Sequence, residues 1–323
     1  MKLPRRQFLH LAAGAAALPA VLRAAWAQSY PTRPVRLIVG FPAGSSSDIT
    51  ARLIGQWLSE RFGQQFTVED KTGAGTNIAT ESVVHAAPDG YTLLWVTQTN
   101  AFNATLYDTL NFNFIHDIQA AASILRVAAV VEVTPSLPVK TVPEFIAYAK
   151  ANPGKLNMAT PGIGSINHVA GELFKMMAGV NLVAVHYRSS IFPDLLGGQV
   201  QVTFSPIPSS LDFIRSGKLR ALAVTSATRA KALPDVPTVG KFVKGYEATA
   251  WFGIGVPANT PAEIVDKLNR EINAGLVDPK FKERLNEQGG IPAPMTPIEF
   301  GKFIAEETEK WGNVLKFANI KAE

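Results

Sequence analysis

The feature that most constrains this chain is an apolar strand pattern that runs directly into a glycine- and serine-rich turn and then a helix. Residues 35–41 form a continuous, β-branched apolar run, which is typical of a strand buried on both faces. Apolar residues then recur at helical spacing over residues 49–58. The turn between them ends in four residues that can each cap a helix, and it reads Pro42, Ala43, Gly44, Ser45, Ser46, Ser47 and Asp48.

This turn favours an anion site. Free backbone N–H groups and the positive end of the helix dipole would meet there, at the carboxyl end of a central strand. An ordinary capped helix without a ligand fits the segment equally well, so the prediction needs a second observation.

The same pattern recurs well over a hundred residues later. Residues 156–159 indicate a strand, residues 160–165 form a turn with two glycines, and residues 167–177 indicate a helix. Two such units on two α/β lobes would point two helix N-termini at one cleft. Taken alone, Gly162 and Gly164 are better explained by a tight turn, so the pairing of the two units carries the prediction.

Elsewhere, strands and helices alternate, which predicts a parallel α/β sheet. A strand is expected at 128–133 and another at 250–256, and a helix with Thr141 as its cap at 143–151. Three proline-initiated helices close the chain, and the residues in position to cap them are Thr260, Asp278 and Thr296.

Length and charge exclude several classes of protein. The 323 residues suffice for two domains, and the absence of cysteine excludes disulfides and thiol chemistry. Four of the 31 basic side chains and no acidic one lie in residues 1–27, so the rest carries 27 basic against 26 acidic side chains. A nearly neutral protein argues against binding to nucleic acid.

The histidines show no metal-ligand spacing, and we expect no metal and no cofactor.

Residues 1–27 are interpreted as an export signal peptide. Arg5 and Arg6 resemble a twin-arginine motif, residues 9–21 form an alanine-rich apolar stretch too short to span a membrane, and residues 25–27 fit a small-x-small cleavage site. The general export route remains open, as does an uncleaved anchor or a disordered tail. We expect a periplasmic, exported protein.

No catalytic motif is present. The nucleophile elbow, S-x-x-K and P-loop patterns are absent. Ser165 and His168 lie three residues apart and are conceivable as a hydrolase pair, but a histidine beside a helix cap is the simpler interpretation. Glycine and hydroxyl turns without an acid–base set indicate binding without reaction, so we do not expect an enzyme.

The chain resembles the Bug (TctC-like) solute-binding proteins of tripartite tricarboxylate transporters. The resemblance spans almost all of the chain after residue 27 and rests on motifs in a fixed order: YPTRPVRLIVGFPAG with Asp48, GAG at 73–75, APDGYTLL at 87–94, LY at 106–107, PGKLN at 153–157, GxGS with His168, LLGGQV at 195–200, GKLRALAVTS at 217–226, ALPDVPTV at 232–239, Trp251 and Trp311.

The resemblance implies a two-lobed α/β fold of the type II periplasmic-binding class, a Venus flytrap. One lobe would comprise residues 28–126 and 250–323, and the other residues 127–249, with the strands at 128–133 and 250–256 crossing between them. Family ligands are mostly small carboxylates and dicarboxylates, with some acidic amino acids or aromatic acids, held between the two glycine turns with ordered water against the first. The ligand-binding residues implied here are Phe41, Pro42, Ala43, Gly44, Ser45, Ser46, Asp48, Thr160, Gly162, Gly164, Ser165, His168, Arg188 and Ser205.

The chain departs from the family pattern around the cleft, at Ser45, Thr76, Ala79, Arg188 with Ser189, and Ser205. The family often has Asp where Ser205 stands, and a hydroxyl cannot neutralise a ligand ammonium. Arg188 would favour a second anionic group, and Asp48 is expected to cap its own helix. We therefore expect a non-amino organic acid, such as a dicarboxylate or an aromatic acid.

The partners expected from the resemblance are the ligand and the membrane subunits of a transporter. A ligand-presenting adaptor for a membrane sensor kinase would share the same site, so this alternative stays open. We expect a monomer that does not bind nucleic acid.

Overall fold

The computed structural model describes residues 30–107, 109–187, 190–287 and 290–321. The predicted export signal and Arg188 lie outside these ranges. None of the helices described is both long and apolar enough to cross a membrane.

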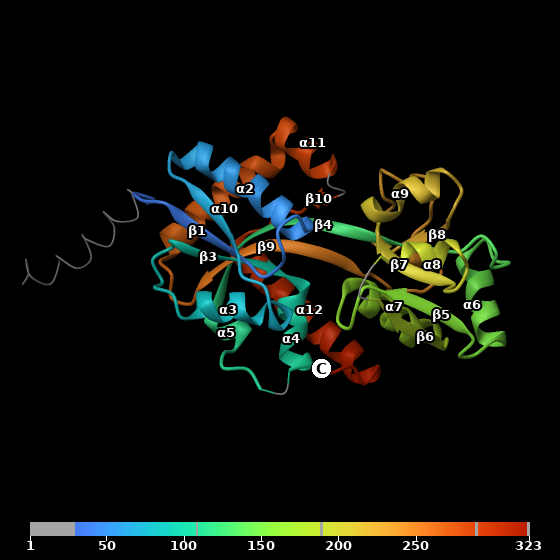
Figure 1. Ribbon diagram of the computed structural model, residues 1–323. Helices are drawn as coiled ribbons and strands as arrows, with labels where there is room; N and C mark the ends of the chain where they lie inside the picture. Colours follow the sequence, from blue (N-terminus) through green and yellow to red (C-terminus); the bar gives the residue numbers. More distant parts are fainter. Residues whose placement is uncertain (1–29, 108, 188–189, 288–289, 322–323) are drawn as a thin grey trace, which may run out of the picture.

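Ten strands in the described ranges form one continuous, strongly elongated sheet (Figure 1). Their order is β2-β1-β3-β9-β4-β7-β5-β6, with β10 and β8 also paired to β4. The strands are β1 (Val35–Val39), β2 (Phe66–Asp70), β3 (Thr92–Thr97), β4 (Ile118–Val133), β5 (Leu156–Thr160), β6 (Leu182–His186), β7 (Val202–Pro206), β8 (Arg220–Val224), β9 (Thr249–Pro257) and β10 (Gly290–Pro292).

The strand β4 divides the sheet into two halves. Residues 118–128 of β4 pair with β9, and residues 129–133 pair with β7. We call β1, β2, β3, β9 and β10 with their helices the first half, and β5 to β8 with theirs the second half. In each half the core strands are parallel, β2-β1-β3 in the first and β6-β5-β7 in the second. The α/β class predicted from the alternation is therefore confirmed. The prediction of a parallel sheet holds only within each half, because β4 pairs antiparallel with β7, β8, β9 and β10, and β3 pairs antiparallel with β9.

Helices cover both faces of each half. In the first half α2, α10 and α11 cover one face, and α3, α4, α5 and α12 the other; in the second half α6 and α7 lie opposite α8 and α9 (Figure 1). Their bounds are α2 (Ser46–Phe62), α3 (Asn77–Val84), α4 (Gln98–Leu106), α5 (Phe114–Asp117), α6 (Val142–Ala151), α7 (Ile166–Ala178), α8 (Phe192–Leu196), α9 (Ile207–Arg215), α10 (Ala262–Val277), α11 (Pro279–Glu287) and α12 (Pro297–Phe317).

The last helix, α12, joins the two halves. Phe300 near its start packs in an apolar cluster of the first half, whereas Trp311 near its end shares a cluster with Phe145 of the second half. Between them the buried Glu307 accepts hydrogen bonds from the indole N–H of Trp251 on β9, at 3.1 Å, and of Trp311, at 2.7 Å. The carboxylate of Glu307 therefore links β9 to α12, the helix that contacts the cores of both halves.

Helix caps follow the sequence in most cases. Thr141 caps α6, Thr296 caps α12 in a capping box with Glu299, and the Asp278 carboxylate accepts from a backbone N–H of α11. The expectation for Thr260 was wrong, because its hydroxyl donates to the carbonyl oxygen of Pro257 and α10 begins without a side-chain cap.

Candidate functional site

The first predicted turn is closed by its own side chains. Ser45 is the N-cap of α2, and its hydroxyl oxygen accepts from the backbone N–H of Asp48 at 3.2 Å. The Asp48 carboxylate accepts in return from the backbone N–H of Gly44 at 2.7 Å. Asp48 was expected to cap its own helix, and this expectation was wrong: Ser45 is the cap, and the Asp48 carboxylate closes the turn before the helix through Gly44.

Asp48 is also neutralised by a cation. Its buried carboxylate pairs with the guanidinium of Arg52 at 2.7 Å, and the same guanidinium pairs with Asp70 at 3.0 Å. Burial, followed by the negative charge of Asp48, raises the pKa of Asp70 above its ordinary value. The Asp48 carboxylate is therefore occupied on both sides, by Gly44 and by Arg52.

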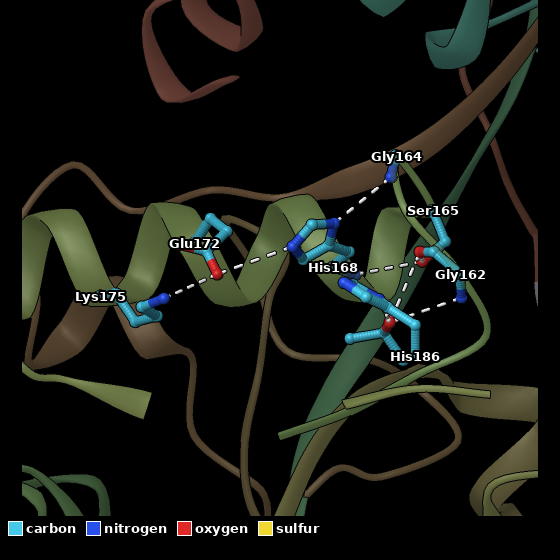
Figure 2. A network of polar contacts seen from close by, with 8 residues as sticks. Gly162, Gly164, Ser165, His168, Glu172, Lys175 and His186 are labelled. Atoms are coloured by element: carbon cyan, nitrogen blue, oxygen red, sulfur yellow. Dashed lines mark hydrogen bonds and ion pairs between the residues drawn. The ribbon is translucent and has the colours of Figure 1, made fainter. Parts of the chain in front are cut away.

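The second turn repeats this arrangement with a histidine in place of the aspartate (Figure 2). Ser165 is the N-cap of α7; its hydroxyl accepts from the backbone N–H of His168 at 3.3 Å and donates to the carbonyl oxygen of Gly162 at 2.7 Å. The ring Nδ1 of His168 accepts from the backbone N–H of Gly164 at 3.3 Å. Gly164 has φ of +72°, a conformation that favours glycine.

His168 is a buried, neutral side chain. Burial, with smaller contributions from His186 and Lys175, lowers its pKa to about 4. Because Nδ1 accepts from Gly164, the proton of the neutral ring lies on Nε2, which faces the Glu172 carboxylate at 3.7 Å (Figure 2). The hydroxyl of Ser165 bonds to backbone atoms and to neither ring nitrogen, so the pair lacks the geometry of a nucleophile and its base.

Two cavities lie between the halves. The larger, of about 730 Å³, is lined by Gly75, Thr99, Asn103, Leu106, Tyr107, Pro161, Gly162, Ile163, Gly164, His186 and Tyr187. The smaller, of about 310 Å³, lies over the crossing strands and is lined by Phe41, Ser45, Ser46, Ser47, Ile49, Thr50, Gln98, Leu125, Val127, Ile166, Pro206, Pro208, Ser209, Ala250, Phe252 and Glu287. Both have a wall from each half.

The predicted site residues are divided between these cavities. Phe41, Ser45 and Ser46 line the smaller one, and Gly162 and Gly164 line the larger one. The remaining described candidates line neither cavity and lie in or behind the turns, namely Pro42, Ala43, Gly44, Asp48, Thr160, Ser165, His168 and Ser205. Ser205 is 1% exposed and accepts a hydrogen bond from the amide of Asn167 at 3.4 Å.

The sequence did not predict that α4 forms part of the wall of the larger cavity. The amide of Asn103 donates at 2.6 Å both to the carbonyl oxygen of Gly75 and to the side-chain oxygen of Asn77, which fixes the glycine turn at 73–75 against α4. Asn103 and Tyr107 then face the larger cavity. The polar residues directly after the carboxyl end of β3 were the available signal.

The described residues contain no group of His, Cys, Asp and Glu side chains arranged to hold a metal ion. The arrangement presents capped helix N-termini, hydroxyls and backbone N–H groups to the cleft. Such groups bind an anion without transferring a proton or forming a covalent bond.

Comparison with known proteins agrees with this geometry. Residues 50–320 match the family described as tripartite tricarboxylate transporter family receptor, TctC. Protein BugT of Bordetella pertussis is 34% identical over 302 residues, covering 91% of this chain and 92% of BugT.

Solved structures show the same likeness. The Rpa4515 protein of R. palustris with adipate superposes with a TM-score of 0.78 at 36% identity, covering 90% of this chain and 99% of that one. MatC of Rhodopseudomonas palustris with bound malate superposes with a TM-score of 0.73 at 28% identity, covering 88% and 100% of the two chains.

Proposed function

Because the chain belongs to the tripartite tricarboxylate transporter receptor (TctC) family, we propose that it captures a small organic carboxylate in the cleft between its two halves. Members of this family are solute-binding proteins with a two-lobed fold, so the chain is a binding protein and not an enzyme. The sensor-adaptor and hydrolase alternatives have no comparable support.

The observation that supports the proposal is the pair of serine-capped helix N-termini, one in each half: Ser45 lines the smaller cavity, and Ser165 directly follows Gly164, which lines the larger one. Ser45 begins α2 in the first half, and Ser165 begins α7 in the second. Charge-assisted hydrogen bonds contribute roughly 1.5–3 kcal/mol each, so about four of them reach the roughly 8 kcal/mol of a micromolar complex. Adipate and malate in related proteins are ligands of this chemistry.

The proposed ligand carries no ammonium group. The Asp48 carboxylate is already paired with Arg52, and the Ser205 hydroxyl is buried and bonded to Asn167. Among the described lining residues the one carboxylate is Glu287, which is solvent-exposed at the end of α11 and offers only a screened attraction. Calorimetry with succinate and aspartate tests this: tighter binding of aspartate would show that a carboxylate of the cleft accepts the ammonium.

We propose further that residues 1–27 export the chain to the periplasm and that the ligand is passed to membrane subunits of a transporter. In this scheme residues 28–126 with 250–323 form one lobe and residues 127–249 the other. A bound anion that contacts both turns links the two lobes and favours their closure. Arg188, in the segment after β6, is proposed to face a second anionic group of the ligand.

A thermal-shift panel of carboxylic acids tests the function. Succinate, malate, adipate and aromatic acids are compared with their neutral amides, and we expect at least one acid, and no amide, to raise the melting temperature. Ser165→Ala should weaken that acid's binding, whereas Thr141→Ala, which removes a similar cap from α6 outside the cleft, should lower stability alone. A panel in which no acid raises the melting temperature contradicts the proposal.

A further inference from the structure

A fully buried carboxyl with no basic partner lies behind the second-half wall of the smaller cavity. Glu132, on β4, is 0% exposed and pairs in register with Thr203 of β7. One carboxyl oxygen accepts from the hydroxyl of Ser210 on α9 at 2.5 Å, and the other has no hydrogen-bond partner among the described residues. A buried carboxylate oxygen without a partner is costly, so this site favours the protonated form.

No charged side chain of the elements packed around Glu132 is paired with it. On β8, Arg220 donates to two backbone carbonyls of the loop after β4, and on α9, Asp212 and Arg215 are exposed. The helix α7 packs its apolar residues on the opposite face of β4, where Val131 lies, and its Glu172 is paired with Lys175. Burial raises the pKa of Glu132 to about 7, opposed by the hydroxyls of Ser210 and Ser205.

Hydroxyl and amide groups connect Glu132 to the cleft. Ser205 lies close enough to favour the ionised form of Glu132, although its geometry falls short of a hydrogen bond. The same hydroxyl accepts from the amide of Asn167, on the first turn of α7. The chain neighbours of this network, Ile166 and Pro206, line the smaller cavity.

We propose that Glu132 is a positioning residue for anion binding, whose neutral form supports the second-half wall, and that a carboxylate entering the cleft is accompanied by uptake of a proton at Glu132. The inference rests on the proposed function, because it requires an anion in the cleft. When Glu132 is ionised, its negative charge opposes the attraction of the α7 N-terminus for the ligand. It also orients the proton of the Ser205 hydroxyl toward itself, while the hydroxyl oxygen remains the acceptor for Asn167.

The effect is a linkage between pH and affinity. If the bound anion raises the pKa of Glu132 by about one, affinity in the alkaline limit is about tenfold weaker than in the acid limit, and about 0.4 proton is taken up per ligand at pH 7.

Calorimetry with adipate from pH 6.5 to 8.5 tests the inference, because adipate stays ionised over that range. Titrations in two buffers with different ionisation enthalpies give the proton uptake directly. The wild type should bind several-fold more weakly at pH 8.5 than at pH 6.5. Glu132→Gln preserves the shape and the Ser210 contact, and it should bind with no proton uptake from this site and with the wild-type affinity of pH 6.5 throughout.

In a second variant the dependence of ligand affinity on pH should shift along the pH axis without being lost. Ser210→Ala removes a hydroxyl that favours the ionised form, so the midpoint of the affinity profile should move to higher pH. Ser216→Ala, which removes an exposed hydroxyl just after the other end of α9, should leave the profile unchanged. Equal pH profiles in the wild type and in Glu132→Gln would overturn the inference while leaving the function intact. No binding of adipate to the wild type at pH 6.5 would refute the inference and count against the function as well.

Discussion

Replacing Glu132 by Gln should change how folding stability depends on pH even when no ligand is present. The folded-state pKa of Glu132 is about 7, against an ordinary value of 4.5. Between these values the folded state keeps a proton that the unfolded state has released, so Glu132 makes the wild type less stable as pH rises. The difference between the two pKa values lowers the unfolding free energy of the wild type by about 3 kcal/mol, and the full effect is reached by about pH 8.

His168 acts in the opposite direction. Its folded-state pKa is about 4, against an ordinary value of 6.5. Between these values the unfolded state binds a proton that the buried ring does not, so His168 makes the protein more stable as pH rises, again by about 3 kcal/mol. The two contributions nearly cancel from pH 5 to 6.5, and the wild type should show a shallow profile there.

Glu132→Gln removes the contribution that makes the wild type less stable as pH rises. Chemical denaturation at pH 5, 6, 7 and 8 should show the variant gaining stability relative to the wild type with each step, by about 2–3 kcal/mol in total. His168→Gln is the matched opposite and should lose stability relative to the wild type at pH 8 but not at pH 5. A constant difference between the wild type and Glu132→Gln across this range would refute the assignment of a raised pKa to Glu132.

Three further predictions concern the turns and the helix that joins the halves. Gly164→Ala puts a Cβ 3.1 Å from Leu106 at φ of +72° and should cost about 1–3 kcal/mol by denaturation and weaken adipate binding in calorimetry. Glu307→Gln should cost about 2 kcal/mol and alter fluorescence, because two tryptophans donate to this carboxylate. Arg52→Met leaves the buried Asp48 without a cation and should cost about 1–3 kcal/mol by denaturation at pH 7.

The sequence predicted the parts of the fold that depend on local chemistry. Ser45 and Ser165 are caps because a serine between an apolar run and a helical pattern satisfies free N–H groups whatever the rest of the chain does. Thr260 stands in the same kind of position, yet its hydroxyl donates to the carbonyl oxygen of Pro257, before the helix boundary at Pro261. The residue pattern does not show whether such a hydroxyl will bond to the helix N–H groups or to a nearby carbonyl oxygen.

The parts that were missed depend on tertiary packing. The helix α4 was not predicted because QTNAFNATL is polar and lacks apolar periodicity, and its asparagines are buried only because they bond to the 73–80 segment. The strand β4 begins ten residues earlier than expected, since its alanine-rich first part gains order by pairing with β9. Ser205 was expected in the cleft but is buried behind it, because α7 covers that end of β7 through Asn167.

In the proposed complex, one anion is held between two turns that belong to different halves of the protein. A crystal structure with adipate, or with whichever acid gives the largest thermal shift, would show these contacts. We expect one carboxylate of the ligand to accept hydrogen bonds, directly or through ordered water, from the segment 41–48 and from the segment 160–168. A carboxylate bound to one turn alone, or at a site outside the two cavities, would contradict the account.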